Sequence, residues 1–120
     1  MRIKAIMATA AALALGAVAF TPSAAVAEDC PLGFVCFYYG YNQTGGMSFK
    51  TDKDWTNQKP ARSYFNNARP QTGYDHVDIT VLSVDKPICA HYGESEGKGN
   101  ISAPPASIRT VSKVRWRGEC

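Results

Sequence analysis

The stretch "CPLGFVCFYYGYNQTGG", residues 30–46, decides the fold of this chain. It places two cysteines around a five-residue loop, continues with a block of aromatic residues and ends on two glycines. Aromatic residues favour strands, and glycine favours the backbone angles of tight turns. The stretch therefore predicts a short cross-linked loop that leads into a first β-strand and a turn.

The residues before this stretch have the pattern of an export signal. Arg2 and Lys4 precede an alanine-rich apolar run, and the small residues AVA occupy positions 25–27. Signal peptidases cleave after such small residues. The apolar run is too short and too rich in alanine for a good membrane anchor. We therefore expect residues 1–27 to be a signal peptide that is removed, and residues 28–120 to form one secreted, extracellular domain.

All four cysteines lie in the expected mature chain, and an even number in an exported protein predicts two disulfides rather than a metal site. Four cysteines allow three pairings, and the sequence alone does not choose among them. Nearness favours Cys30 with Cys36, and elimination then leaves Cys89 with Cys120. So small a core gives marginal stability by itself, so we expect the fold to depend on these cross-links.

Strand signals dominate the chain, and no window shows the apolar spacing of a helix. In the segment HVDITVLSV, residues 76–84, the apolar side chains of Val77, Ile79 and Val81 alternate with the residues between them. By contrast, the segment 52–60 predicts at most a single helical or 3₁₀ turn, capped by Asp52 or Asp54. Short segments separated by turn residues predict an all-β antiparallel sandwich; the segments are 34–39, 47–51, 62–66, 76–84, 88–92 and 111–116.

An aromatic residue and a glycine seven positions apart occur twice, each pair followed later by a serine-bearing strand. This pattern resembles the βγ-crystallin Greek-key motif. The resemblance implies a disulfide-stapled, βγ-crystallin-like double Greek-key β-sandwich, with motifs at about 30–69 and 74–117. The motif residues would be Tyr38, Gly45 and Ser63 in the first copy, and Tyr92, Gly99 and Ser112 in the second.

The segments CPLGFVCFYY, ARSYFNN and VRW are similar to a narrower group, the secreted actinobacterial peptidase inhibitors typified by the Streptomyces metalloproteinase inhibitor. The resemblance implies inhibition of an extracellular protease, most simply a metalloprotease, through a rigid loop and without chemistry of the protein's own. In that family a close cysteine pair constrains the inhibitory loop. Here Cys89 matches the later cysteine, and the residues before it contain no earlier one.

The best local candidate for an inhibitory loop is Pro87, Ile88, Cys89 and Ala90. Pro87 fixes its φ angle, Cys89 anchors the chain through a disulfide, and Ile88 would fill an apolar subsite of the protease. The alternative is that residues 88–92 form a core strand.

A second class of function is a non-inhibitory binding or toxin-like module. Tyr41, Trp55 and Tyr74 lie near expected turns, where exposed aromatic side chains would anchor a ligand. Enzyme chemistry is not supported, because His76 and His91 lie on different expected strands and no cysteine is expected to be free. We expect a non-enzyme, with both histidines in structural roles.

We expect no cofactor, no metal site and no nucleic-acid or membrane partner, and we expect a monomer. Two histidines supply too few ligands for zinc. The segments QKPARS and IRTVSK, which correspond to crystallin calcium sites, lack the carboxylates that calcium requires. Without Arg2 and Lys4 the formal charge falls from +3 to about +1, which is no basic surface for nucleic acid.

Overall fold

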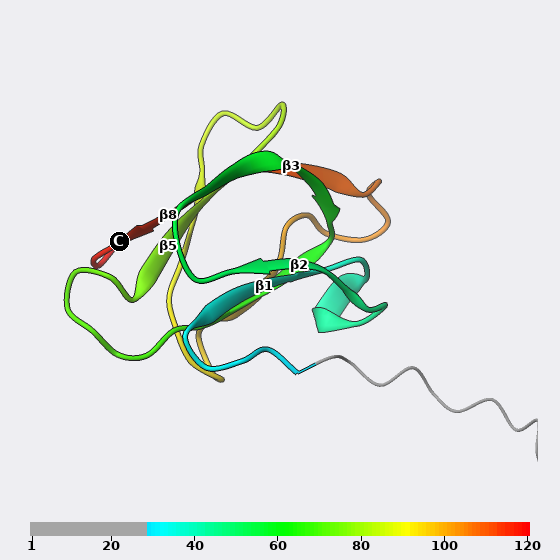
Figure 1. Cartoon of the computed structure of the whole chain (residues 1–120). Coiled ribbons are helices and arrows are strands. Elements are labelled where there is room, and N and C mark those ends of the chain that lie inside the picture. The colour runs from blue at the N-terminus through cyan, green and yellow to red at the C-terminus, as the bar shows by residue number, and fades with distance from the viewer. Residues whose placement is uncertain (1–28) are drawn as a thin grey trace, which may run out of the picture.

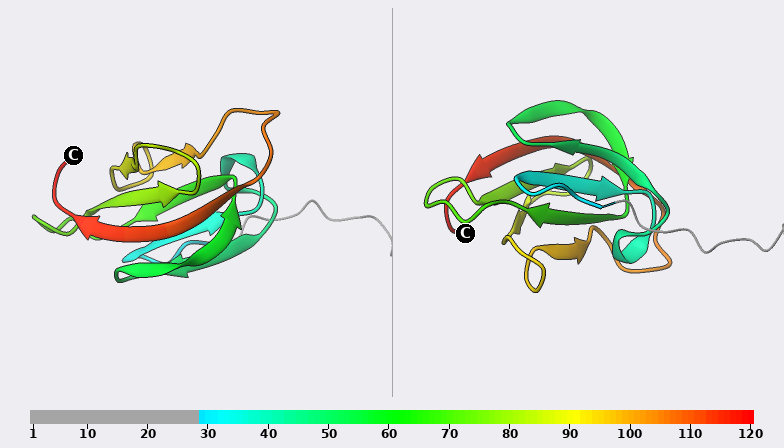
Figure 2. Two further views of the ribbon diagram at one scale, coloured as in Figure 1. Left: turned by 90° about the horizontal axis from the view of Figure 1, so that it is seen from above. Right: turned by 60° about the horizontal axis from the view of Figure 1, so that its bottom comes forward.

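The computed structural model describes residues 29–120, so the expected signal peptide, residues 1–27, lies outside the described part. Two four-stranded antiparallel sheets face each other and form a β-sandwich, as expected. Figure 2 shows the two layers, with β1 (cyan) in one and β8 (red) in the other. Within residues 29–120 no helix is long and apolar enough to cross a membrane.

The first sheet has the strand order β2-β1-β4-β7. Its strands are β1 (Phe34–Tyr38), β2 (Met47–Thr51), β4 (Ser63–Asn67) and β7 (Lys98–Asn100). The second sheet has the order β3-β8-β5-β6. It comprises β3 (Trp55–Ala61), β5 (His76–Val81), β6 (Ile88–Ala90) and β8 (Arg109–Arg117). A short 3₁₀ helix, η2 (Tyr41–Gln43), lies between β1 and β2 (Figure 1).

The main core lies between the sheets and follows the alternation of the strands. Val77, Ile79 and Val81 of β5 are buried, as their spacing predicts, and Val111 and Val114 of β8 join them. The first sheet contributes Val35 and Phe37 from β1. Phe37, Phe49 and Trp55 form a continuous stack, with ring centroids 4.4 and 4.2 Å apart. The apolar faces of both sheets are therefore buried against each other.

The opening stretch covers the other face of the first sheet. Cys36 and Tyr38 alternate with Val35 and Phe37 along β1, so they point away from the main core. There they form a second buried cluster with Cys30 and Phe65. Phe37 and Tyr38 are thus on opposite faces, and both are buried because the loop from Cys30 closes over the outer face.

The strands of residues 29–120 form two runs of four, β1–β4 and β5–β8, and each run contributes one strand to the sheet of the other. The third strand of the first run, β3, pairs with β8 of the second run. The third strand of the second run, β7, pairs with β4 of the first. Each sheet therefore needs residues from both halves of the chain, and neither half can complete a sheet alone.

Two strands differ from the expectation from sequence. The segment 52–60 was expected to hold a helical turn, but Trp55–Ala61 is strand β3. The polar residues within it are exposed because β3 is an edge strand that pairs only with β8. Lys98–Asn100 lies outside the segments expected to be strands but forms edge strand β7. The short helical turn occurs instead at Tyr41–Gln43.

Disulfides join Cys30 to Cys36 and Cys89 to Cys120, which is the expected pairing. The Cα atoms of the pairs are 5.8 and 5.9 Å apart, and no cysteine is free in residues 29–120. The first bond belongs to the cluster on the outer face of the first sheet. The second ties edge strand β6 to the C-terminus of the chain.

Candidate functional site

The connection between β5 and β6, residues 82–87, projects beyond the strands that it joins, at the top of Figure 1. Leu82 and Val84 expose 43% and 41% of their surface, although both are apolar. Two backbone bonds fix the start of the loop: the Leu82 N–H donates to the carbonyl of Thr110 over 2.9 Å, and that of Val84 to Val81 over 3.2 Å. The loop therefore presents two apolar side chains on a fixed base.

The loop predicted from sequence lies mostly in a strand, which corrects that prediction. Ile88, Cys89 and Ala90 form β6 and pair with Ile79, Asp78 and Val77, in that order. Ala90 is buried and Ile88 packs against the main core, so neither is free to enter a protease cleft. Of these four residues only Pro87 is exposed, at the last position of the loop. The physical reason is that β6 pairs the backbone groups along one edge of β5, while Ile88 and Ala90 extend the apolar face of Ile79 and Val77.

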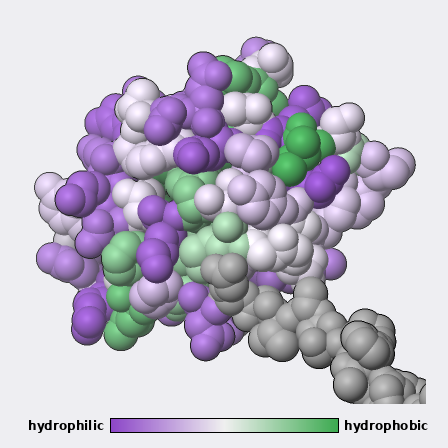
Figure 3. All heavy atoms as spheres, turned by 45° about the vertical axis from the view of Figure 1, so that its right-hand side comes forward, coloured by the Kyte–Doolittle hydropathy of each residue, from purple (hydrophilic) through white to green (hydrophobic). Residues whose placement is uncertain are grey.

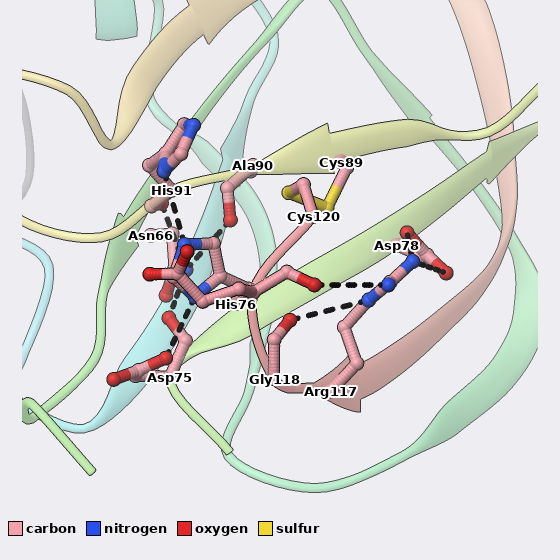
Figure 4. The surroundings of a disulfide bond; sticks show 11 residues. Asn66, Asp75, His76, Asp78, Cys89, Ala90, His91, Arg117, Gly118 and Cys120 are labelled. Carbon is pink, nitrogen blue, oxygen red and sulfur yellow. Dashed lines mark hydrogen bonds and ion pairs between the residues drawn. A yellow bond between two sulfur atoms is a disulfide. The ribbon is translucent and has the colours of Figure 1, made fainter. Parts of the chain in front are cut away.

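The strand that carries the end of the loop is anchored at two points. The Cys89–Cys120 disulfide joins β6 to the C-terminal segment, as Figure 4 shows. Buried Asn66 of β4 donates from its side-chain nitrogen to the carbonyls of Asp75, Ala90 and His91, over 2.9 to 3.3 Å. The base of the β5–β6 hairpin is therefore tied to both sheets.

The first predicted motif is a packed corner between β1 and β2. The hydroxyl of Ser63 donates to the carbonyl of Gly40 over 2.7 Å and accepts from the Gln43 N–H over 2.8 Å. Gly45 has a φ of +77°, and a Cβ there would lie 2.9 Å from the backbone nitrogen of Gly40. Glycine is required at this position for both reasons. Tyr38 ends β1 in the buried outer cluster.

The second copy of the motif does not occupy the equivalent place, which is a further correction. Tyr38 and Gly45 flank the connection from the first to the second strand of their run, whereas Tyr92 and Gly99 lie after the second strand, β6. Gly99 is inside β7 without a positive φ; a Cβ there would lie 2.7 Å from the Cζ atom of Tyr64. The physical reason is that the shorter β5–β6 loop needs no glycine corner. Ser112 does lie in β8, the fourth strand, as Ser63 lies in β4, and donates to the Thr80 carbonyl over 3.4 Å.

The three aromatic residues considered as ligand anchors are in different environments. Trp55 is part of the stack in the core. Tyr41 donates its hydroxyl to the carbonyl of Ala106 over 2.8 Å, and the Arg62 guanidinium lies over its ring. Tyr74 is 64% exposed and borders a hollow together with Leu32 and Arg69. Only Tyr74 has the exposure that a binding anchor needs.

The two histidines, expected on different strands, are in contact (Figure 4). Nε2 of His76 is 3.0 Å from Nδ1 of His91, and Nδ1 of His76 is 2.6 Å from a carboxylate oxygen of Asp75. Burial by itself raises the pKa of Asp75, but hydrogen bonds from Gln71 and His76 and the charge of His76 outweigh it and lower this pKa. The sequence does contain a signal for this contact, because the β5–β6 hairpin that pairs Val77 with Ala90 brings their outer neighbours together.

Neither curated proteins nor solved structures gave a match to this chain. A model of peptidase inhibitor family I36 matches residues 23–78, which contain the opening cysteine loop, the strands β1–β4 and the start of β5. This match confirms the resemblance to a peptidase inhibitor family and indicates a non-enzyme. The crystallin-like superfamily stays a prediction. Residues 23–78, slightly less than half of the chain, are therefore similar to peptidase inhibitor family I36.

Proposed function

We propose that this peptidase inhibitor acts on an extracellular metalloprotease through the β5–β6 loop, residues 82–87. The observation that carries the proposal is the exposure of Leu82 and Val84 on this loop. Metalloproteases of the thermolysin type have apolar subsites, and Val84, near the middle of the loop, offers a side chain of the right kind. The proposal places the inhibitory contact before β6 rather than at Ile88.

The rigidity of the loop base supports this assignment. A loop that is already ordered loses little conformational entropy when it docks, and tight inhibition depends on that saving. Here the backbone bonds of Leu82 and Val84, the fixed φ of Pro87 and the Cys89–Cys120 disulfide all restrict the loop. The protein needs no catalytic group for this function.

The distribution of apolar surface is also consistent with anchoring by single side chains. On the face seen in Figure 3, hydrophobic side chains occur as separate patches among hydrophilic ones. The large apolar residues exposed in the described part are Leu32, Tyr39, Tyr74, Leu82, Val84 and Ile108. Leu82 and Val84 are the two that share one projecting loop.

The test is an inhibition titration of a thermolysin-type enzyme with wild type, Val84→Asp and Leu32→Asp. Leu32 is the matched control because it is an apolar residue that is also exposed, by 53%, but does not belong to the loop. It borders the hollow beside Tyr74, before the start of β5, whereas the loop follows the end of β5. We expect Val84→Asp to raise Ki at least about 30-fold, the effect of a 2 kcal/mol hot spot. Leu32→Asp should leave Ki unchanged.

The outcomes separate the target from the loop. Inhibition of a serine protease but not of the metalloprotease would contradict the target class. Equal inhibition by wild type and Val84→Asp would contradict the loop but not the target. Circular dichroism of both variants checks that the fold is intact.

We further propose that the strand exchange is that of a βγ-crystallin-like double Greek key, and that the protein is secreted as a monomer after loss of residues 1–27. The exchange of β3 and β7 between the sheets supports the first point, and the two disulfides support export. Mass spectrometry of the secreted protein should give a chain that begins at residue 28. Size-exclusion chromatography with light scattering should give the mass of one chain.

A further inference from the structure

The contact between His76 and His91 forms a second candidate site, separate from the β5–β6 loop. His76, at the start of β5, is 1% exposed, whereas His91, directly after β6, is exposed. The rings meet edge to face with centroids 4.8 Å apart. Both residues border a hollow of about 470 Å³ that also contains Glu96 and Glu119. The pair is therefore accessible from one side.

The hydrogen-bond chain leaves one proton between the two rings. The Asp75 carboxylate can only accept, so Nδ1 of His76 carries the proton that it donates over 2.6 Å. One further proton then joins Nε2 of His76 to Nδ1 of His91 over 3.0 Å. If His91 instead carries its proton on Nε2, then His76 Nε2 and His91 Nδ1, 3.0 Å apart, both have free lone pairs in the space between the rings.

We propose that His76 Nε2 and His91 Nδ1 bind one divalent transition-metal cation in place of this proton, with Cu²⁺ bound more tightly than Zn²⁺. Metal–nitrogen bonds of about 2.0 Å across nitrogens 3.0 Å apart give an angle of about 95° at the metal. That angle suits the tetragonal geometry of Cu²⁺ better than the tetrahedral geometry of Zn²⁺. Imidazole nitrogen suits both ions, and Cu²⁺ has the higher affinity for such ligands. Water would complete the coordination.

The surroundings of the histidines have the features of a built ligand site. A metal-binding histidine commonly donates its second nitrogen to a carboxylate, which fixes its tautomer, and Asp75 takes that role for His76. Asn66 fixes the backbone on both sides, because it donates to the carbonyls of Asp75 and His91. The positions of both rings are therefore set before any cation arrives.

The third group near the histidines cannot act as a thiolate ligand. The sulfur of Cys120 lies within 4.8 Å of the histidine nitrogens, but it is bonded to Cys89. The carboxylates of Glu96 and Glu119 border the same hollow and add negative charge that favours a cation. Two imidazoles with carboxylate charge nearby define the site, which does not depend on the proposed target protease.

The test is calorimetric titration of the oxidised, secreted protein, made without a histidine tag, with Cu²⁺ and with Zn²⁺. We expect one Cu²⁺ per chain at this site and weaker Zn²⁺ binding. Asp75→Asn should weaken Cu²⁺ binding about 10- to 100-fold, as loss of an outer-shell partner does, and His91→Ala should weaken it further. The control is Glu94→Gln, because Glu94 is exposed and pairs with Lys98; its affinity should match wild type.

Electron paramagnetic resonance of the Cu²⁺ complex separates this site from the amino terminus of the chain, which can also bind copper. The spectrum should show two imidazole nitrogens in wild type and not in His91→Ala. His91 is exposed, so its replacement should leave the fold intact; His91→Gln serves if the alanine variant does not fold. No binding, equal affinity of wild type and His91→Ala, or a wild-type spectrum without two imidazoles would each overturn the proposal.

Discussion

Removal of the Cys89–Cys120 disulfide should cost a large part of the stability of this protein. The bond closes a segment with a sequence separation of 31 residues. In the chain-entropy account, such a loop restricts the unfolded chain by about 12 cal/mol/K, or about 4 kcal/mol at 25 °C. Cys120 is exposed and Cys89 half-buried, so alanine at both positions removes little packing. A small domain has a free energy of unfolding of about 5–15 kcal/mol, so the double variant should fold but only marginally.

The assay is equilibrium unfolding in urea, followed by circular dichroism, for wild type and for Cys89→Ala/Cys120→Ala. We expect a much lower midpoint and a somewhat larger dependence on urea, because the unfolded variant is less compact and exposes more surface. Glu119→Ala is the control, since it alters the same terminal segment and keeps the bond. Its free energy of unfolding should stay within about 0.5 kcal/mol of wild type.

A loss below about 1 kcal/mol for the double variant would refute this reasoning. It would show that the unfolded chain is already restricted in the region that the bond closes, so that the bond adds little. A loss well above about 5 kcal/mol would also contradict it, because the bond would then stabilise the native hairpin directly.

Three further predictions concern single side chains. In urea titrations, Gly45→Ala should lower the free energy of unfolding by at least about 1–2 kcal/mol more than Gly46→Ala. Both glycines have a positive φ, but only at Gly45 would a Cβ lie against backbone atoms. Equal losses for the two variants would contradict this. The pKa of the Asp75 carboxyl is lower in the folded than in the unfolded protein, so the ionised carboxylate stabilises the fold above about pH 4, the pKa of the unfolded state. This stabilisation is lost as the pH falls through the lower pKa of the folded state. The free energy of unfolding, measured between pH 2 and 7, should show that loss in wild type and not in Asp75→Asn. Tyr41→Phe should cost about 1 kcal/mol in thermal unfolding through its bond to Ala106, and no change would mean that water replaces the bond.

The strands with apolar alternation could be predicted from the sequence, and the polar edge strands could not. The spacing of Val77, Ile79 and Val81 marks a face that must be buried, so β5 was predicted with its correct core face. Strand β3 contains Asn57, Gln58 and Lys59, all exposed, and its partners in β8 lie 48 to 59 positions away in the chain. Such a strand has almost no local signal.

The candidate site shows the same division between local and long-range information. The disulfide pairing could be predicted from the nearness of Cys30 to Cys36 and by elimination for Cys89 and Cys120. Nearness and elimination depend only on the positions of the cysteines in the chain. The residues predicted as an inhibitory loop lie mostly in strand β6, because Cys89 suggested a constrained loop whereas its register with Asp78 makes it part of a strand. The contact of His76 with His91 depends on the same register.

The position of the disulfide also bears on how a loop of this kind keeps its shape. In the family that the sequence resembles, a close cysteine pair constrains the inhibitory loop itself. Here Cys89 is bonded to Cys120, so the disulfide restrains strand β6, which follows the loop. Val84, at the tip of the loop, lies outside the segment that the disulfide closes. The shape of the tip must then come from the Leu82 and Val84 backbone bonds and from Pro87. A loop restrained in this way has a fixed base and a tip held by its own backbone bonds, so Val84 would lose little conformational entropy on docking into the proposed apolar subsite.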